Sequence, residues 1–407
     1  MTSQKILGVI EGFYGTPWSH DNRLACIDFI SQSGWNTYVW AAKLEPRHRD
    51  QWNEPFTSAE IEQFAELSHR QKGVTCAVGL TPGDSATSEQ VIGKLTPAIN
   101  AGCQAIALCF DDLPVLHAAT QHQLLANAVA NHFAVPVWIV PTHYAGTNAS
   151  AYLTALCTGL HPDIEVMWTG PTVVTDSISW EDAVTRASVT GGRQPLVWDN
   201  TPVNDARMRQ HLHLGPFSGR DVTLLAHCSG FLWNPMEEFE ASLPTLVSAA
   251  AWSHGEDPIA AWNEYVNNKN LLLIAEATAY PTDAHWPGDQ PSREWWLSMS
   301  DLVVEDEQLR PWVESAKKGA QLALASLHVI TAEHELTQKE RNLILFQLMG
   351  WADYQSQQKK TFGSGPRTRP IATQDSDGRF VLLPSSIEEH ESLVDSLVRQ
   401  ALRLLRG

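Results

Sequence analysis

Basic residues are scarce in this chain of 407 residues. Lys and Arg together number 28 against 46 Asp and Glu, which gives a formal net charge of -18. An acidic surface repels the phosphate backbone of nucleic acids, because proteins bind that backbone mainly through Lys and Arg. The composition therefore predicts that nucleic acid is not a partner.

Long apolar segments are also missing. The N-terminal segment MTSQKILGVIEGF has no extended apolar region of the kind found in signal peptides. No other apolar run reaches the roughly 20 residues that a membrane-spanning helix needs. We therefore expect no membrane association and a cytoplasmic location.

Motifs for metals and cofactors are absent as well. The six Cys are scattered without a CxxC pair, and several lie in apolar runs, which favours buried free thiols in a reducing compartment. No HxH or HExxH motif indicates a transition metal. The first apolar run leads into Glu11-Gly12 rather than into the Gly-rich phosphate turn of a dinucleotide-binding fold. We predict neither a cofactor nor a metal.

Eight short apolar runs, rich in residues that favour strands, alternate with segments of helical character such as 21–33 and 57–72. Near-continuous apolar strands are typical of a parallel sheet that is covered on both faces. Eight repeats of strand and helix predict an α/β fold, a (β/α)8 TIM barrel. The strands are expected at residues 6–10, 37–41, 75–80, 105–110, 137–140, 165–168, 196–198 and 230–233.

The chain is too long for one ordinary core, so a smaller second domain is expected. The barrel should close with helices at 243–252 and 257–267, the latter with Asp257 as its N-cap and Pro258 at its first position. Residues 280–292, rich in Pro and Gly, indicate a linker. We therefore assign residues 1–278 to the catalytic barrel and 279–407 to a C-terminal α-helical domain.

The pattern after the linker is helical. Residues 310–354 indicate two packed helices, and 359–370 indicate a mobile basic loop. Apolar residues spaced by four form a single stripe on a last helix, at Leu393, Leu397, Ala401 and Leu405. Because no carboxylate or aromatic motif in this region completes a pocket, we expect it to shape the approach of the substrate rather than the chemistry.

The active site of a (β/α)8 barrel forms where the strands end and the following loops begin. In this sequence those positions hold carboxylates, amides, one Lys and aromatic rings. Such a set suits a sugar, because rings stack on it and polar groups bind its hydroxyls. Taken singly, the glycines are typical of turns and the aromatics of a core. The candidates are Gly12, Lys43, Asp111, Asp112, Tyr144, Trp198, Asn200, Asp205 and Asn234.

Asp111 and Asp112 directly follow the fourth apolar run and are the sharpest feature. Two acids at that point are costly unless they are solvated or used. Taken alone, the dipeptide fits an acidic loop start or a helix N-cap better than a catalytic pair. Another alternative is a hard cation bound by Asp111, Asp112, Asp199 and Asp205. The positive charge of Lys43, expected at the same end of the barrel, argues against such a cation site.

A longer series of motifs resembles the family-84 glycoside hydrolases, the protein O-GlcNAcases and their bacterial relatives. The resemblance spans about residues 5–250 in the order of that family, and no catalytic position is missing. It begins with the segment GVIEGFYGTPW at 8–18. It continues with NTY at 36–38, Lys43, FDD at 110–112, PTHY at 141–144, WTGP at 168–171, WDN at 198–200, ND at 204–205, LGP at 214–216, NP at 234–235 and EFEA at 238–241.

The resemblance implies a role for each candidate. Asp111 would orient the N-acetyl group of the substrate and stabilise charge on its nitrogen, and Asp112 would be the general acid and then the general base. Tyr144 would hydrogen-bond the acetamido carbonyl, and Trp198 would help to wall the acetamido pocket. The hydroxyls of the sugar would be held by Gly12 (through its backbone), Lys43, Asn200, Asp205 and Asn234.

Two adjacent carboxylates fit substrate-assisted hydrolysis. The usual retaining pair stands ~5 Å apart on opposite sides of the bond, which neighbouring residues on one strand end do not easily achieve. If the acetamido oxygen of the substrate attacks instead, the protein needs one carboxylate for the amide N–H and one as an acid.

The sequence therefore predicts a retaining exo-β-N-acetylglucosaminidase that acts, through an oxazoline intermediate, on GlcNAc-bearing glycoproteins or glycopeptides. Two alternatives stay open. One is a non-catalytic module that binds GlcNAc or glycopeptides, which the presence of both Asp111 and Asp112 disfavours. The other is a hydrolase of other GlcNAc-containing glycans such as glycosaminoglycans.

Overall fold

The computed structural model describes residues 4–112, 119–279, 291–332, 334–362, 365–366, 372–383, 389–390 and 392–406. Eight parallel strands form a closed barrel in which β1 pairs with both β2 and β8. The predicted (β/α)8 fold is confirmed, and each strand end lies within one residue of its predicted position. The strands are β1 (Ile6–Glu11), β2 (Thr37–Trp40), β3 (Thr75–Leu80), β4 (Ala105–Cys109), β5 (Val137–Val140), β6 (Glu165–Trp168), β7 (Leu196–Asp199) and β8 (Gly230–Trp233).

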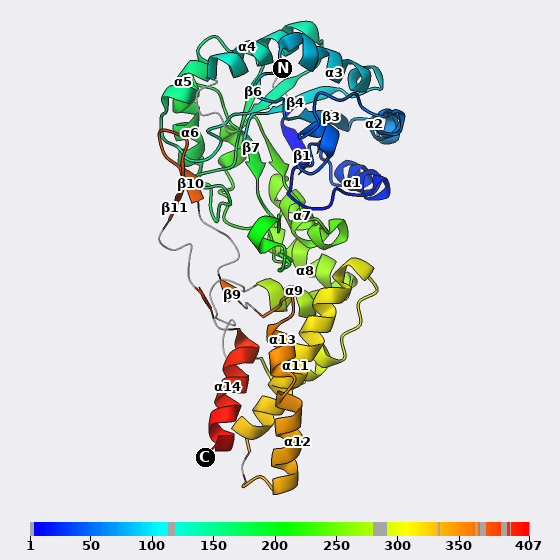
Figure 1. Ribbon diagram of the computed structural model, residues 1–407, viewed down its shortest axis with the longest axis vertical. Helices are drawn as coiled ribbons and strands as arrows, with labels where there is room; N and C mark the ends of the chain where they lie inside the picture. The colour runs from blue at the N-terminus through cyan, green and yellow to red at the C-terminus, as the bar shows by residue number, and fades with distance from the viewer. Residues whose placement is uncertain are drawn as a thin grey trace.

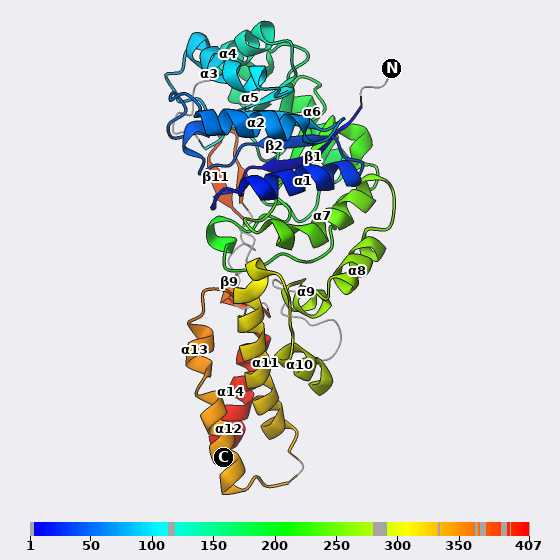
Figure 2. The same cartoon turned by 90° about the vertical axis from the view of Figure 1, so that its right-hand side faces the viewer.

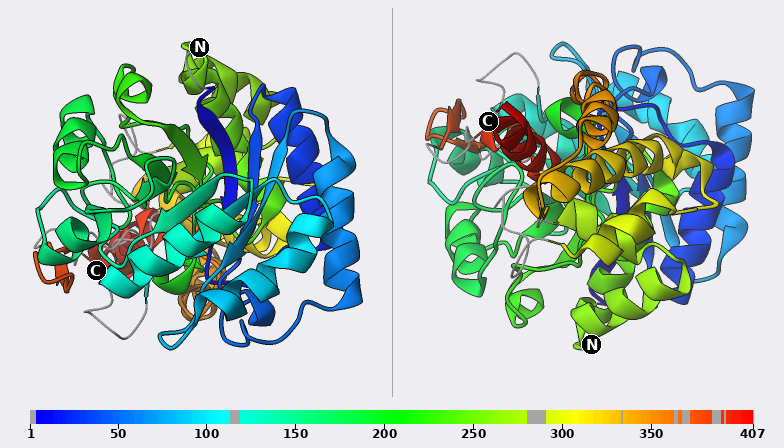
Figure 3. Two further views of the ribbon diagram at one scale, coloured as in Figure 1. Left: turned by 90° about the horizontal axis from the view of Figure 1, so that it is seen from above. Right: turned by 90° about the horizontal axis from the view of Figure 1, so that it is seen from below.

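Helices connect successive strands and surround the barrel (Figures 1 and 3). The link between β7 and β8 instead contains two short 3-10 helices, Ala206–Met208 and Leu224–His227. As predicted, Asp257 caps α8, because its side chain accepts hydrogen bonds from the backbone N–H groups of residues 259 and 260. The helices of the barrel are α1 (His20–Gln32), α2 (Ser58–Arg70), α3 (Ser88–Asn100), α4 (Ala119–His132), α5 (Ala151–Cys157), α6 (Trp180–Val189), α7 (Phe239–Ser253) and α8 (Pro258–Asn268).

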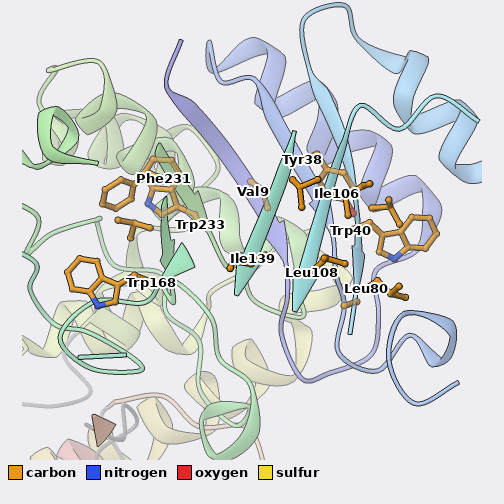
Figure 4. Close-up of a cluster of buried hydrophobic side chains, with 14 of the residues drawn as sticks. Val9, Tyr38, Trp40, Leu80, Ile106, Leu108, Ile139, Trp168, Phe231 and Trp233 are labelled. Atoms are coloured by element: carbon orange, nitrogen blue, oxygen red, sulfur yellow. The ribbon is translucent and has the colours of Figure 1, made fainter. Parts of the chain in front are cut away.

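Large side chains that face outward from the strands fill the space beneath the helices (Figure 4). The indole rings of Trp35 and Trp233 stack there with centroids 4.3 Å apart. Smaller side chains such as Ala77 and Ala107 belong to the cluster that fills the barrel interior. This alternation follows from the period of two in a strand, and it fixes the strand ends that carry the candidate residues.

The helices after the barrel form an elongated body that extends away from it (Figures 1 and 2). Residues 310–354 form three helices rather than the two predicted, because Gly350 separates α12 from α13. The predicted apolar stripe of the last helix is confirmed, since Leu397 and Ala401 are buried and α14 packs along α11. The helices are α9 (Leu272–Ala279), α10 (Arg293–Ser300), α11 (Arg310–Ile330), α12 (Gln338–Leu348), α13 (Trp351–Gln355) and α14 (Leu393–Arg406).

The C-terminal part also contains strands, which the sequence did not predict. β10 (Ala372–Gln374) and β11 (Phe380–Leu382) form an antiparallel hairpin, and β9 (Gly365–Pro366) pairs with β12 (Glu389–His390). Figure 1 places the hairpin beside the barrel, far from the helices that precede and follow it in the sequence.

Several predictions on the connecting segments fall partly outside the described residues. This applies to the linker at 280–292, of which only 291 and 292 are described, and to much of the loop at 359–370. The start of that loop is held in place, because the Lys359 ammonium donates to the Arg209 carbonyl (2.9 Å) and lies 4.1 Å from the centroid of the Trp312 ring. The boundary at residue 278 stays a prediction.

The state of the cysteines and the apolar character of the helices can be compared with the predictions made from composition. All six Cys are free thiols and five are buried, as predicted. None of the helices in the described ranges has the length and apolar character needed to cross a membrane.

Candidate active site

A cavity of about 460 Å³ opens at the carboxyl ends of the barrel strands. All nine candidate residues line it, although they come from six different strand ends or the loops that follow them. They are Gly12, Lys43, Asp111, Asp112, Tyr144, Trp198, Asn200, Asp205 and Asn234. The structure therefore brings the whole predicted set together, while the role of each residue stays a prediction.

Asp111 lies at the buried side of the cavity. One of its oxygens, Oδ2, accepts a hydrogen bond from the buried ammonium of Lys43. Burial alone would disfavour the Lys43 cation, but the negative charge of Asp111 outweighs it and holds the pKa of Lys43 above its ordinary value. The other oxygen, Oδ1, is buried and has no hydrogen-bond partner among the described residues. This buried acceptor is thus left without a donor, on a residue that lines the cavity.

Asp112 is placed differently from its neighbour, because its side chain is exposed at the mouth of the cavity. Its φ of 54° lies in the left-handed region, which Asp tolerates better than most residues and which sends the two carboxylates in different directions. The phenol of Tyr14 donates to Asp112 Oδ2 (2.7 Å), and that of Tyr144 donates to Oδ1 (3.2 Å). Arg49 in turn donates to the Tyr14 oxygen (2.6 Å).

A network of amides holds the opposite wall. The Trp198 indole N–H and the Asn234 side chain both donate to Asn200 Oδ1, at 3.0 and 2.8 Å. The Gly12 N–H donates to Asn234 Oδ1 (3.2 Å). A Cβ at Gly12 would lie only 2.2 Å from the Trp198 ring, so this position requires glycine. The network fixes the indole face that closes one side of the cavity.

Asp205 completes the polar lining. Its Oδ2 accepts a hydrogen bond from the Tyr14 N–H (2.7 Å), which ties the loop after β1 to the loop after β7. Burial raises the pKa of Asp205 above its ordinary value, although the Tyr14 N–H and Lys43 lower it in part.

Asp199, one of the four proposed ligands of a cation, lies outside the cavity. It is almost fully buried and forms a two-pronged ion pair with Arg220, through Nε (2.7 Å) and Nη2 (2.8 Å). The reason is the alternation of β7, which turns Trp198 inward and Asp199 outward. Within the described part of the chain, no cluster of three or more His, Cys, Asp or Glu side chains could hold a metal ion.

Three residues of the C-terminal hairpin also line the cavity: Ala372, Phe380 and Leu382. The Phe380 ring contacts that of Tyr144, with centroids 6.0 Å apart. An aromatic residue beyond the linker therefore does line the cavity although no motif marks it, while the expectation that this region shapes the approach of the substrate rather than the chemistry stays a prediction. The only signal in the sequence is the short apolar run after the DSDG turn at 375–378, which does not by itself point to the barrel.

Two further residues were not among the candidates. Tyr14 lies within the first motif, and its phenol contacts Asp112. Arg49 carries no recognisable signal, because it lies beyond the end of β2 in an irregular loop. Both are found only once the loops are placed in space.

Comparisons with known proteins agree with this architecture. A sequence model of a family described as beta-N-acetylglucosaminidase matches residues 7–277. The protein O-GlcNAcases of Rattus norvegicus and Mus musculus are each 31% identical over 273 residues, covering 61% of this chain and 30% of theirs. The chain thus matches less than a third of the length of these relatives.

Solved structures share the fold along nearly the whole chain. A mutant of the O-GlcNAc hydrolase of Thermobaculum terrenum has a TM-score of 0.76 at 23% identity, covering 98% of this chain and 94% of that one. The protein CpGH84B has a TM-score of 0.77 at 21% identity, covering 98% of this chain and 77% of that one. The similarity therefore extends beyond the barrel into the C-terminal part.

Proposed function

Since this chain belongs to the β-N-acetylglucosaminidase family, we propose that it is a retaining exo-β-N-acetylglucosaminidase. Its substrates would be glycoproteins or glycopeptides with β-linked GlcNAc on Ser or Thr. The relatives named O-GlcNAcase and O-GlcNAc hydrolase support this choice of substrate. The free, mostly buried thiols support a cytoplasmic location, because secreted proteins tend to pair their cysteines.

The placement of Asp111 and Asp112 carries the proposal. Asp111 is buried, lines the cavity and is paired with Lys43 through one oxygen, while its other oxygen has no partner among the described residues. Asp112 is exposed at the mouth, where it meets the phenols of Tyr14 and Tyr144. A buried acceptor suits the N–H of the acetamido group, and a carboxyl at the mouth suits proton transfer with the departing group. Substrate-assisted hydrolysis needs this division of labour.

The reaction would run in two steps. The acetamido oxygen attacks the anomeric carbon while the bond to the leaving oxygen breaks, and Asp112 gives its proton to that oxygen. Asp111 stabilises the positive charge that develops on the acetamido nitrogen of the resulting oxazoline. Asp112 then removes a proton from water, which attacks the anomeric carbon and opens the oxazoline. The two inversions leave the product in the β configuration.

The remaining roles follow the lining of the cavity. Trp198, fixed by Asn200, would wall the acetamido pocket. Tyr144 would hydrogen-bond the acetamido carbonyl. The backbone of Gly12 and the side chains of Lys43, Asn200, Asp205 and Asn234 would bind the hydroxyls of the sugar.

A series of fluorinated substrates tests the mechanism. Replacing acetyl by mono-, di- and trifluoroacetyl weakens the attacking oxygen with little change in size, so kcat/KM should fall steadily along the series. A thiazoline that mimics the oxazoline should bind tightly. A flat series would instead indicate attack by a protein carboxylate, and an α-configured first product would indicate direct attack by water.

The acid is tested separately by Asp112→Ala. This variant should lose far more rate on substrates with poor leaving groups than on activated phenyl glycosides, which need little protonation. Added azide should partly restore turnover and yield a β-glycosyl azide. Equal losses on both substrate types without an azide product would remove Asp112 from this role.

The alternative functions are separated by simpler assays. A chromogenic N-acetylglucosaminide distinguishes an enzyme from a GlcNAc-binding module, because only the enzyme releases the chromophore. Comparing glycopeptides with glycosaminoglycan fragments then distinguishes the two classes of substrate.

A further inference from the structure

The β10–β11 hairpin is attached firmly to the barrel although it begins at residue 372 and the last barrel strand ends at residue 233. The buried Gln374 side chain accepts a hydrogen bond from the Ala145 N–H and donates one to the Thr142 carbonyl, both at 2.9 Å. The Ala372 carbonyl accepts from the Val173 N–H (2.7 Å). Thr142 and Ala145 lie on either side of Tyr144 in the loop after β5, and Val173 lies in the loop after β6. Because the hairpin is bonded to both loops, it is a fixed part of the cavity wall.

One face of the hairpin is apolar and turned to the cavity. Phe380 and Leu382 share this face because side chains alternate along a strand, and Ala372 lies opposite Leu382 in the register. All three residues line the cavity, yet Phe380 and Leu382 are still 53% and 56% exposed. Much of their apolar surface therefore lies at the rim, available to a group that extends out of the cavity.

The position of the exposed Phe380 and Leu382 surface relative to Asp112 indicates which part of the substrate would extend over it. Phe380 contacts the ring of Tyr144, and the phenol of Tyr144 donates to Asp112. An acid must stand beside the oxygen of the departing group. The hairpin face therefore lies one side chain away from the point where the sugar joins the rest of the substrate, while the Tyr14 and Arg49 side of Asp112 is polar.

We propose that the β10–β11 hairpin forms the binding site for the aglycone, and that Phe380 favours peptides with apolar side chains next to the glycosylated residue. The inference rests on the proposed function, because it assigns a specificity to the same active site. The occupant is an extended peptide segment whose apolar side chain covers the exposed part of Phe380 and Leu382. A part of the chain outside the barrel thereby sets substrate preference.

Val381 provides a matched control. It lies between Phe380 and Leu382 on the same strand, is also exposed, and does not line the cavity. Phe380→Ala and Val381→Ala therefore remove exposed apolar surface from opposite faces of one hairpin. Neither side chain is buried, so the hydrogen bonds of Gln374 that attach the hairpin remain in both variants.

The test uses two synthetic glycopeptides that differ only in the residues flanking Ser(GlcNAc), which are Phe in one and Gly in the other. The wild-type protein should prefer the Phe peptide in kcat/KM. Phe380→Ala should lower kcat/KM for that peptide about tenfold, the loss typical of one aromatic contact at an interface, and by less than about threefold for the Gly peptide. Val381→Ala should leave both unchanged, and inhibition by free GlcNAc should be the same in all three proteins.

The other outcomes are equally informative. A wild-type protein that cleaves both peptides without preference, or a Phe380→Ala variant that loses activity equally on both, overturns the inference and leaves the proposed function standing. So does a loss in Val381→Ala that matches the loss in Phe380→Ala. A wild-type protein that cleaves no GlcNAc substrate, including an aryl glycoside, overturns the proposed function as well.

Discussion

The ion pair of Lys43 and Asp111 is the feature whose removal should have the largest combined effect on stability and activity. In Lys43→Met the apolar side chain occupies a similar volume, but Asp111 keeps its negative charge. Its Oδ1 has no partner among the described residues and its Oδ2 loses Lys43, so a buried carboxylate is left uncompensated. Breaking a buried pair in this way lowers the free energy of unfolding by about 3–5 kcal/mol.

Thermal unfolding measures this loss. For a chain of this length, 3–5 kcal/mol corresponds to a decrease in Tm of about 4–6 °C at pH 7. The decrease should shrink at acidic pH, because the unpaired carboxyl can then take up a proton. The double variant Lys43→Met/Asp111→Asn, which has no buried charge at this place, should recover most of the Tm while remaining inactive.

Lys94→Met is the control. Lys94 is also buried, but its ammonium donates to the Glu54 carbonyl (2.5 Å) and lies over the Phe56 ring, away from the cavity. Lys94→Met leaves no carboxylate without its ion-pair partner. The loss in unfolding free energy should therefore be about 1 kcal/mol, and kcat/KM on an aryl glycoside should not change. A Tm of Lys43→Met equal to that of the wild type, or a double variant no more stable than Lys43→Met, would refute the reasoning.

Three further perturbations have defined outcomes. Gly12→Ala should lower kcat/KM about tenfold to a hundredfold, because the new methyl group displaces the Trp198 ring at a cost of about 1–3 kcal/mol, and an unchanged rate would contradict the close approach. Burial lowers the pKa of His48 to about 3 and those of His122 and His211 to about 4, whereas the unfolded chain binds protons near pH 6.5. Their contribution to stability is therefore complete above pH 6.5 and falls as the pH drops from 6.5 towards 4, by up to roughly 1.4 kcal/mol per pH unit for each His. Tm should decrease over that range and the decrease should be weaker in His122→Gln, so a slope that is the same in both proteins would count against this explanation. Activity should survive prolonged chelation, and a loss that Mg²⁺, Ca²⁺ or Zn²⁺ restores would assign a metal to the site.

The barrel was predictable because its strands carry an unusually direct signal. Runs such as 105–109 are apolar at every position, since both faces of the sheet are covered, and eight of them alternate with helices. Barrel geometry then brings the strand ends together, which is why residues as distant as Gly12 and Asn234 could be assigned to one cavity.

The orientation of individual side chains was harder to predict. Asp199 and Asn200 are adjacent polar residues at the end of β7, but only Asn200 lines the cavity. The partner of Asp199 is Arg220, whose position depends on an irregular loop. Tyr14 and Arg49 likewise depend on loops whose shape is set by tertiary contacts rather than by local pattern.

The hairpin could not be predicted at all. Its strands have three residues each, and they follow a helical region and a polar segment. Its attachment includes the side chain of Gln374, which looks like an ordinary surface residue in the sequence. Local sequence contains no information about a contact between residues more than 200 positions apart.

This separation has a consequence for the order in which the protein becomes functional during synthesis. Ribosomes release the chain from its N-terminus, and domains generally fold as they emerge. The eight strands of the barrel are complete at residue 233, whereas the bonds from Gln374 to Thr142 and Ala145 form only after some 140 more residues have been translated. A nascent chain therefore closes its barrel, with both aspartates in place, before the rim of the cavity exists. A growing polypeptide would therefore complete the binding surface for its substrate only after its catalytic barrel has formed.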